Sequence, residues 1–230
     1  MTTPKQQQNT TPTNTPRTPA IDRPILTGHS ARVADAADKV IAAAATRVLA
    51  PIGLVRKGRS RTWVDDHGWW LLNVEFQPSS HAVGCYLNIG TQHLWVVRDH
   101  LTLEGLERPL GPSSFATFDG DEAFLHAMEQ VVAVAADAIR HRREAHVDGV
   151  EALTRLAVGD DDLNAGIAAA LLGDDVTARS RLAGRIHSTD RALADSYLGL
   201  SAPDARTRAT SAIVETRAKL NLTPVDSAWW

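Results

Sequence analysis

The sequence predicts an α+β fold, in which an antiparallel β-meander packs against two helices and an all-helical C-terminal region follows. Three observations lead to this prediction: a helical apolar stripe at 30–48, short alternating strands within 54–90, and an almost purely helical pattern after residue 148. The composition agrees, because 43% hydrophobic and 22% charged residues in a chain of 230 are typical of a globular protein.

Charge and cysteine content exclude several classes of protein. A formal net charge of -3 argues against a general nucleic-acid coat or a polybasic membrane binder. The single cysteine, Cys85, leaves no partner for an intramolecular disulfide. No apolar run approaches the ~20 residues of a membrane helix, and the N-terminus lacks the apolar centre of a secretion signal. We therefore expect a soluble, cytoplasmic protein.

The N-terminal region divides into a tail and a first helix. Residues 1–24 are rich in Thr, Pro and Gln, so we expect a disordered tail. The helix is predicted to begin at Ser30 as N-cap and to stop at Pro51 and Gly53. Its apolar stripe consists of Val33, Ala37, Val40, Ile41, Ala44 and Val48.

Four short segments are predicted to form the meander: 54–57, 60–65, 69–77 and 82–90. Pairing across the 78–81 loop, from Gln77 opposite Ala82, places only apolar residues on one face. The apolar pairs are Phe76 with Val83, Val74 with Cys85, Leu72 with Leu87 and Trp70 with Ile89. The second face is mostly polar, with Asn73 opposite Tyr86, Glu75 opposite Gly84 and Leu71 opposite Asn88.

The hairpin before it is less regular. Pairing Val64 with Trp69 and Trp63 with Trp70 would put Arg61 beside apolar residues, so we expect a bulge or a strand end there. Residues 91–118 carry mixed signals that allow one more edge strand.

A second long helix is predicted over 121–144, with acidic residues at its start and basic residues at its end. Its buried stripe comprises Phe124, Met128, Val131, Ala135 and Ile139. Further helices are predicted at 148–158, 161–172, 174–187, 189–199 and 203–220, with tight connections between them. The expected organisation is a tail at 1–24, an α+β domain at 25–146, a helical region at 147–222 and a tail at 223–230.

The string IGLVRKGRSRTW, followed by WWLLNVEFQPSS and YLNIG, resembles the bacterial domain-of-unknown-function family 4304. The positions that carry the resemblance are Gly53, Arg56, Trp63, Gln77, Ser79, Asn88 and Gly90. The resemblance covers roughly residues 30–145. It implies an α+β fold and no established activity, so no catalytic residue follows from it.

The polar sheet face is the first candidate site. It gathers one carboxylate, three amides and a phenol on neighbouring strands: Asn73, Glu75, Gln77, Tyr86 and Asn88. Such groups on a rigid sheet can form the floor of a ligand site. A solvent-facing sheet side is also polar by default. The amides favour the functional interpretation, since they are poor strand formers.

The second candidate is a basic-aromatic hairpin. Cations beside stacking rings suit single-stranded nucleic acid or a phosphorylated ligand. The cations are Arg56, Lys57, Arg59 and Arg61, and the rings are Trp63, Trp69 and Trp70. The alternative is that Trp63 and Trp70 belong to the core and the arginines guard a sheet edge. The net charge makes nucleic acid the weaker interpretation.

No cofactor, metal or catalytic motif is evident. The histidines and aspartates are scattered without metal-ligand spacing, and no glycine-rich phosphate loop or nucleophile elbow exists. Cys85 falls on the apolar face of a strand, where a thiol acts as a small hydrophobe.

Two functions remain open. The favoured one is a non-enzymatic binding or accessory protein whose partner is another protein. Trp229 and Trp230 support it, because two large rings need a surface to pack against. The alternative is a small-ligand binder or enzyme that uses Glu75 and its polar neighbours, which requires a concave pocket and a Glu75 perturbed by burial.

Overall fold

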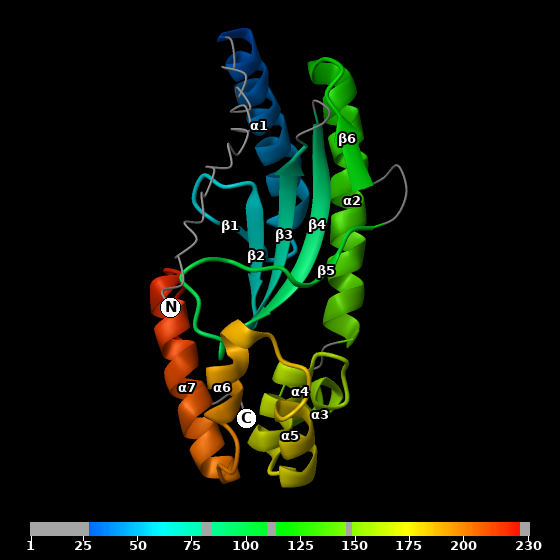
Figure 1. Ribbon diagram of the computed structural model, residues 1–230. Coiled ribbons are helices and arrows are strands. Elements are labelled where there is room, and N and C mark those ends of the chain that lie inside the picture. Colours follow the sequence, from blue (N-terminus) through cyan, green and yellow to red (C-terminus); the bar gives the residue numbers. More distant parts are fainter. Residues whose placement is uncertain (1–27, 80–83, 110–113, 146–148, 226–230) are drawn as a thin grey trace, which may run out of the picture.

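The computed structural model describes residues 28–79, 84–109, 114–145 and 149–225. A helix, six strands and a second long helix form one part, and helices α3 to α7 lie at one end of its sheet (Figure 1). This arrangement confirms the predicted α+β class. The tail predicted at 1–24 and the two tryptophans Trp229 and Trp230 lie outside the described residues.

Two long helices, α1 (Gly28–Leu49) and α2 (Asp121–Ala145), cover one face of the sheet. α1 begins two residues before Ser30, so Ser30 is not its N-cap. The predicted stripe of α2 is buried, as are Ala37, Ile41 and Ala44 of α1, while Val40 and Val48 are partly buried against the same core. Since every third or fourth residue of each helix is apolar, one stripe faces the sheet and excludes water from it.

The sheet is antiparallel and has the order β1-β2-β3-β4-β5, with β6 also paired to β4. The strands are β1 (Val55–Arg56), β2 (Thr62–Asp66), β3 (Trp70–Pro78), β4 (Gly84–His93), β5 (Glu104–Glu107) and β6 (Phe115–Thr117). The region 91–118 therefore holds two short strands, where one edge strand was expected.

The predicted register of the central hairpin is wrong by four residues. Val74 lies opposite Ile89 rather than Cys85, and Glu75 lies opposite Asn88 rather than Gly84. Pairing ends at Pro78 opposite Cys85, so the connection is longer than the 78–81 loop that was expected. Side chains alternate with period two, so an even shift leaves every residue on its predicted face.

The β2–β3 hairpin is shifted in the same way. Trp63 pairs with Val74, and Val64 pairs with Asn73. β2 begins at Thr62, so Arg61 stands just outside the strand and forms an ion pair with Asp38 of α1. The irregularity predicted at this arginine is therefore resolved by a strand end.

The second face of the sheet is crossed by residues 94–103, which we call the strap (Figure 1). Gly90 of β4 allows the close approach, because a Cβ at this position would stand 2.7 Å from Leu103 Cα. Gln92 holds the strap at two points, accepting from the Thr102 amide at 2.9 Å and donating to the His100 carbonyl at 3.3 Å. The polar face is therefore partly covered by its own chain and not by the C-terminal helices.

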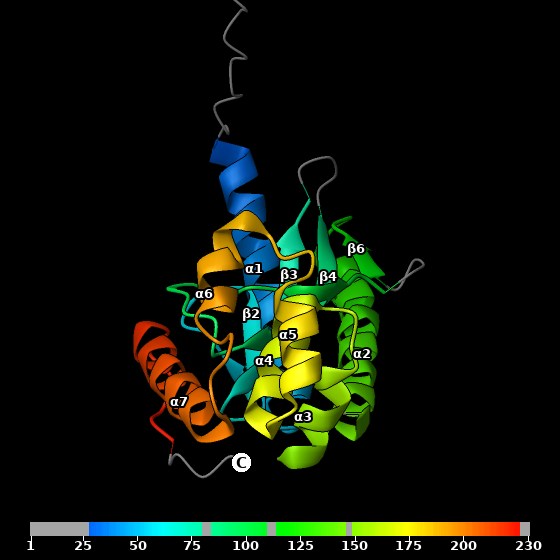
Figure 2. The ribbon, with the colours of Figure 1, turned by 60° about the horizontal axis from the view of Figure 1, so that its bottom comes forward.

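The helical part contains α3 (Val150–Ala157), α4 (Asp162–Leu172), α5 (Asp175–Leu182), α6 (Arg191–Asp195) and α7 (Ala202–Lys219), with a short 3-10 turn, η2 (Ser188–Asp190), before α6 (Figure 2). Local signals set several ends: Asp161, Asp174 and Ser201 cap three helices with side-chain oxygens, and Gly173 ends α4 at φ 83°. The helices expected at 174–187 and 189–199 are shorter than predicted.

Consecutive aspartates at the end of β2 join the two parts. Asp65 and Asp66 point to opposite faces of the sheet because strand side chains alternate. Asp65 accepts from Arg143 of α2 at 2.7 Å, whereas Asp66 accepts two hydrogen bonds from Arg217 of α7. One strand end thus anchors both the long helix α2 and the C-terminal helix α7.

Candidate functional site

The polar face brings the predicted residues together on one side of β3 and β4. Glu75 lies opposite Asn88, and Gln77 lies opposite Tyr86. Asn73 is further along the same face, opposite Gly90. The face is continuous, but its two ends have different surroundings.

The Asn73 end is covered by the strap. Asn73 is fully buried, and its Nδ2 donates to the Thr102 carbonyl at 2.7 Å. Its Oδ1 has no hydrogen-bond partner among the described residues. The Asn73 amide therefore holds the strap. This structural role explains why a poor strand former stands at this position, without a ligand site.

The opposite end is open and is organised by a residue that the sequence analysis missed, Arg108. Its Nε and Nη2 donate to Asn88 Oδ1 at 3.2 and 3.1 Å, and its Nη2 also donates to Gln77 Oε1 at 3.3 Å. The guanidinium lies 4.4 Å from the centre of the Tyr86 ring, which packs against Phe115 at 4.5 Å. We call these residues the Arg108 cluster: Gln77, Tyr86, Asn88, Arg108 and Phe115.

Hydrogen bonds continue from this cluster along the face. Asn88 Nδ2 donates to Gln77 Oε1 at 2.9 Å and to Glu75 Oε2 at 3.1 Å. Asn88 is almost fully buried, whereas Gln77 and Arg108 are exposed. The network therefore holds the exposed arginine in place from beneath, and Arg108 Nη1 has no partner within the described residues. A rigidly held, exposed guanidinium can bind a carboxylate or phosphate.

The basic hairpin does not form a single cationic surface. Arg56 donates to the Ser60 and Arg59 carbonyls and lies over Trp63, and Arg61 pairs with α1. Lys57 Nζ binds carbonyls at the end of α7, at Leu220 and Asn221. Arg59 alone among the four cations is exposed. The contacts of Arg56, Lys57 and Arg61 therefore join the hairpin to itself, to α1 and to the end of α7.

The rings of this region belong to the core. Trp63, Trp69 and Trp70 are buried. Trp69 stacks on Trp95 at 4.9 Å, and Trp95 Nε1 donates to Asn164 of α4 at 2.8 Å. The stacked rings therefore lie where the sheet meets the helical part, and none is free to stack on a base.

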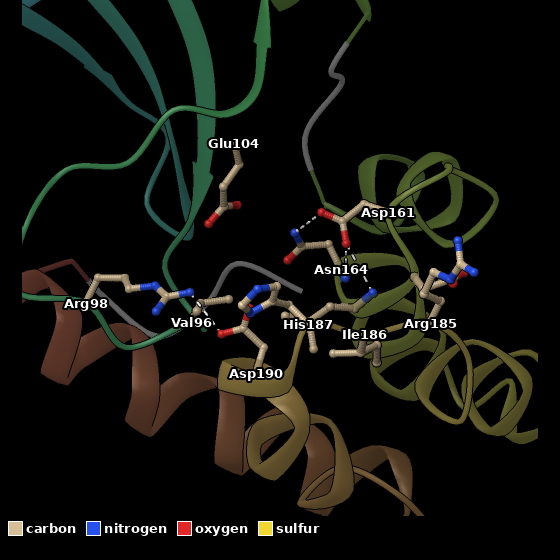
Figure 3. Close-up of a pocket in the computed structure, with 11 residues that line it drawn as sticks. Val96, Arg98, Glu104, Asp161, Asn164, Arg185, Ile186, His187 and Asp190 are labelled. Atoms are coloured by element: carbon tan, nitrogen blue, oxygen red, sulfur yellow. Dashed lines mark hydrogen bonds and ion pairs between the residues drawn. The ribbon is translucent and has the colours of Figure 1, made fainter. Parts of the chain in front are cut away.

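A cavity of about 210 Å³ lies between the strap and the helical part (Figure 3). Charged residues of both signs line it, but several are already paired. Arg98 binds Asp190 at 2.9 Å, and Asp161 caps α4 and accepts from Asn164 at 2.8 Å. Glu104 Oε2 faces His93 Nδ1 at 3.1 Å. The Arg98–Asp190 pair ties the strap to the helical part, and the other pairs hold α4 and the β4–β5 edge, so we assign the cavity a structural role.

A carboxylate–histidine pair lies at the same end of the sheet. Asp65 Oδ2 is 2.8 Å from His67 Nε2, and His67 stacks on Trp70 at 4.0 Å. Burial acts to raise the pKa of Asp65, but hydrogen bonds from His67 and Arg143 outweigh it, so the pKa lies below its ordinary value of 3.8. The charged carboxylate therefore stabilises the fold at neutral pH.

No group of three or more His, Cys, Asp or Glu residues within the described ranges is placed to hold a metal ion. Cys85 is buried with its Sγ 3.4 Å from Met128 Sδ, and burial raises the pKa of its thiol to about 11. Such a thiol is a poor nucleophile at neutral pH. Across the described part of the chain, no helix has both the length and the apolar character of a membrane span.

Comparison with known proteins adds no relative. No family model matches the chain, and no curated protein or solved structure matches it either.

Proposed function

We propose that this chain is a non-enzymatic protein-binding or accessory module that docks an acidic segment of another protein on the Arg108 cluster. One observation carries the proposal: Arg108 is exposed, yet Asn88, Gln77 and the Tyr86 ring already hold its guanidinium. A side chain that is ordered before binding loses less conformational entropy when a partner arrives. Arginine and tyrosine are also the residue types that most often dominate binding energy.

The chemistry of the cluster indicates what the partner presents. Arg108 Nη1 carries two N–H groups without partners in the described part of the chain, and each of them can donate to a carboxylate oxygen. Tyr86 and Phe115 offer apolar surface beside this charge. Glu75, at the other end of the open face, disfavours a second acidic group there. The partner segment is therefore an Asp or Glu next to an apolar side chain, followed by a neutral or basic residue.

The alternatives have weaker support. A ligand site or active site around Glu75 requires an enclosing pocket. The cavity between the strap and the helical part, the one beside β1 and the one within the helical part are lined by other residues. Nucleic-acid binding by the hairpin requires free cations, and three of the four are engaged within the chain. The resemblance to the family 4304 stays a prediction and assigns no activity.

The test joins affinity capture to direct titration. Proteins captured by the wild-type chain are purified and titrated against wild type, Arg108→Ala and the matched control Arg59→Ala, which removes an exposed arginine away from the cluster. We expect Arg108→Ala to weaken a specific partner at least about tenfold, or about 1.4 kcal/mol, and Arg59→Ala to leave it unchanged.

Two further measurements sharpen this test. Arg108→Lys keeps the charge but loses the planar guanidinium, so its affinity for the partner should lie between those of Arg108→Ala and wild type. Replacing the acidic residue of the partner should remove the dependence on Arg108. If every captured protein binds Arg108→Ala as tightly as wild type, the proposal is wrong.

A further inference from the structure

Leu106 of β5 is an exposed leucine beside the Arg108 cluster, with 49% of its surface accessible. Its neighbours in the strand show which way it points. Glu107 pairs with Arg142 of α2 at 2.8 Å, so its side chain lies on the helix-covered face. Arg108 reaches Asn88 on the polar face. Because side chains alternate along a strand, Leu106 lies on the polar face together with Arg108.

A β-bulge in β5 sets this direction. Between the paired positions of the two strands, β5 has Gly105 and Leu106 where β4 has only Gly90. Gly105 has a φ of 56°, in the left-handed region that glycine adopts without strain and that bulges use. The additional residue reverses the alternation beyond it. Without the bulge, Leu106 and Arg108 would face α2, so the bulge brings an apolar side chain and a cation to the polar face.

Apolar surface therefore flanks the Arg108 guanidinium on two sides. Leu106 precedes Arg108 by two residues, and Tyr86 precedes Asn88, which binds Arg108, by two residues. Since β4 and β5 are antiparallel, Tyr86 and Leu106 lie on opposite sides of the guanidinium. Two residues of a strand span roughly 6.6 Å, so the three contacts follow one another at about this interval along β4. Alternate side chains of an extended peptide have the same spacing.

We propose that the acidic segment docks in an extended conformation with the pattern apolar-x-acidic-x-apolar, and that Leu106 is a specificity-determining residue for it. This inference rests on the proposed protein-binding function and specifies its partner. The acidic side chain meets Arg108, one apolar side chain meets Leu106, and the other meets Tyr86 and Phe115. The side chains at the two x positions point away from the sheet.

Two peptides of identical composition test the spacing. KSLSESLSK has a leucine two residues before and two residues after its glutamate, whereas KSSLELSSK has its leucines directly beside the glutamate. Each peptide is titrated into the full chain by calorimetry. Neighbouring side chains of an extended peptide point to opposite sides, so the second peptide cannot present its glutamate and leucines to one surface. We expect KSLSESLSK to bind at least about tenfold more tightly. Equal affinities, or no binding of KSLSESLSK, overturn the proposal.

Leu106→Ser tests the leucine contact directly. Burial of the remaining exposed half of this side chain corresponds to about three- to tenfold in affinity, so the variant should bind KSLSESLSK more weakly by that factor. The matched control is Val176→Ser, which replaces a valine of α5 that is 76% exposed and lies outside the polar face. This control should bind as wild type does. Both replaced side chains are exposed, so thermal unfolding of the two variants should match wild type.

The captured partners of the protein-binding test separate this inference from the function on which it rests. If Arg108→Ala weakens a partner and Leu106→Ser binds it as wild type does, the extended pattern is wrong and the protein-binding function stands. If Arg108→Ala binds every partner as wild type does, both are wrong. Weakening by both variants, with Val176→Ser unchanged, is the expected result.

Discussion

Replacing Arg217 by methionine should detach α7 from the sheet more effectively than any change at the helix surface. Only 2% of Arg217 is exposed. Its guanidinium binds both Asp66 carboxylate oxygens, at 2.8 and 2.7 Å, and the Gly68 carbonyl at 2.7 Å. Its Nε donates to the Thr223 carbonyl at 2.9 Å. Methionine keeps a long apolar stem but leaves these acceptors without their donor.

The expected loss follows from burial. Removing one member of a buried ion pair costs about 3–5 kcal/mol, because the other charge is left unpaired. The Asp66 side chain is 32% exposed, so water can hydrate the unpaired carboxylate and reduce this cost. We therefore expect the free energy of unfolding to fall by about 2–4 kcal/mol. For a chain of this size the midpoint should fall by roughly 4–16 °C, at about 2–4 °C per kcal/mol.

Urea and thermal unfolding, followed by circular dichroism and tryptophan fluorescence, measure this loss. The matched control is Lys219→Met on the same helix, where the side chain is 44% exposed and pairs with Glu215 at 2.7 Å. An exposed pair of this kind is worth under about 0.5 kcal/mol. If Arg217→Met destabilises the chain no more than Lys219→Met does, the argument from the buried ion pair is refuted.

Two further changes test the sheet. Asp65→Asn should lower stability at pH 7 by about 1–3 kcal/mol. Folding lowers the pKa of Asp65 below 3.8, so the charged form stabilises the fold above that pH. The difference in the free energy of unfolding between variant and wild type should therefore vanish as the pH falls through the lowered pKa. A difference independent of pH would contradict this. Gly90→Ala should cost about 1–3 kcal/mol, since its Cβ would collide with Leu103. Hydrogen exchange of the strap amides should then speed up, and unchanged protection would oppose the predicted collision.

Local patterns predicted the elements of this fold. The stripes of α1 and α2 required only the spacing of apolar residues, and the helices predicted from 161 and 174 begin within one residue of α4 and α5. The face of each strand residue was also predictable, because alternation assigns it. Register was not predictable, since any even shift of β3 against β4 satisfies the same alternation.

The candidate site shows the same division. Alternation placed Gln77, Tyr86 and Asn88 on one face, as the structure has them. Arg108 could not be found in this way, because it lies in a segment without a clear period and reaches the face only through the path of β5. Nor did any pattern indicate that Asn73 holds the strap, since its partner Thr102 is distant in sequence.

The amino-acid order alone determined the class of fold, the buried stripes and the polarity of each sheet face, because these depend on spacing over a few residues. Only the tertiary structure decided which part of the polar face stays open and how Arg108 is held there. It also decided which acceptors the buried Arg217 guanidinium binds. Those outcomes depend on contacts between residues that are far apart along the chain, and short-range periodicity carries no information about them.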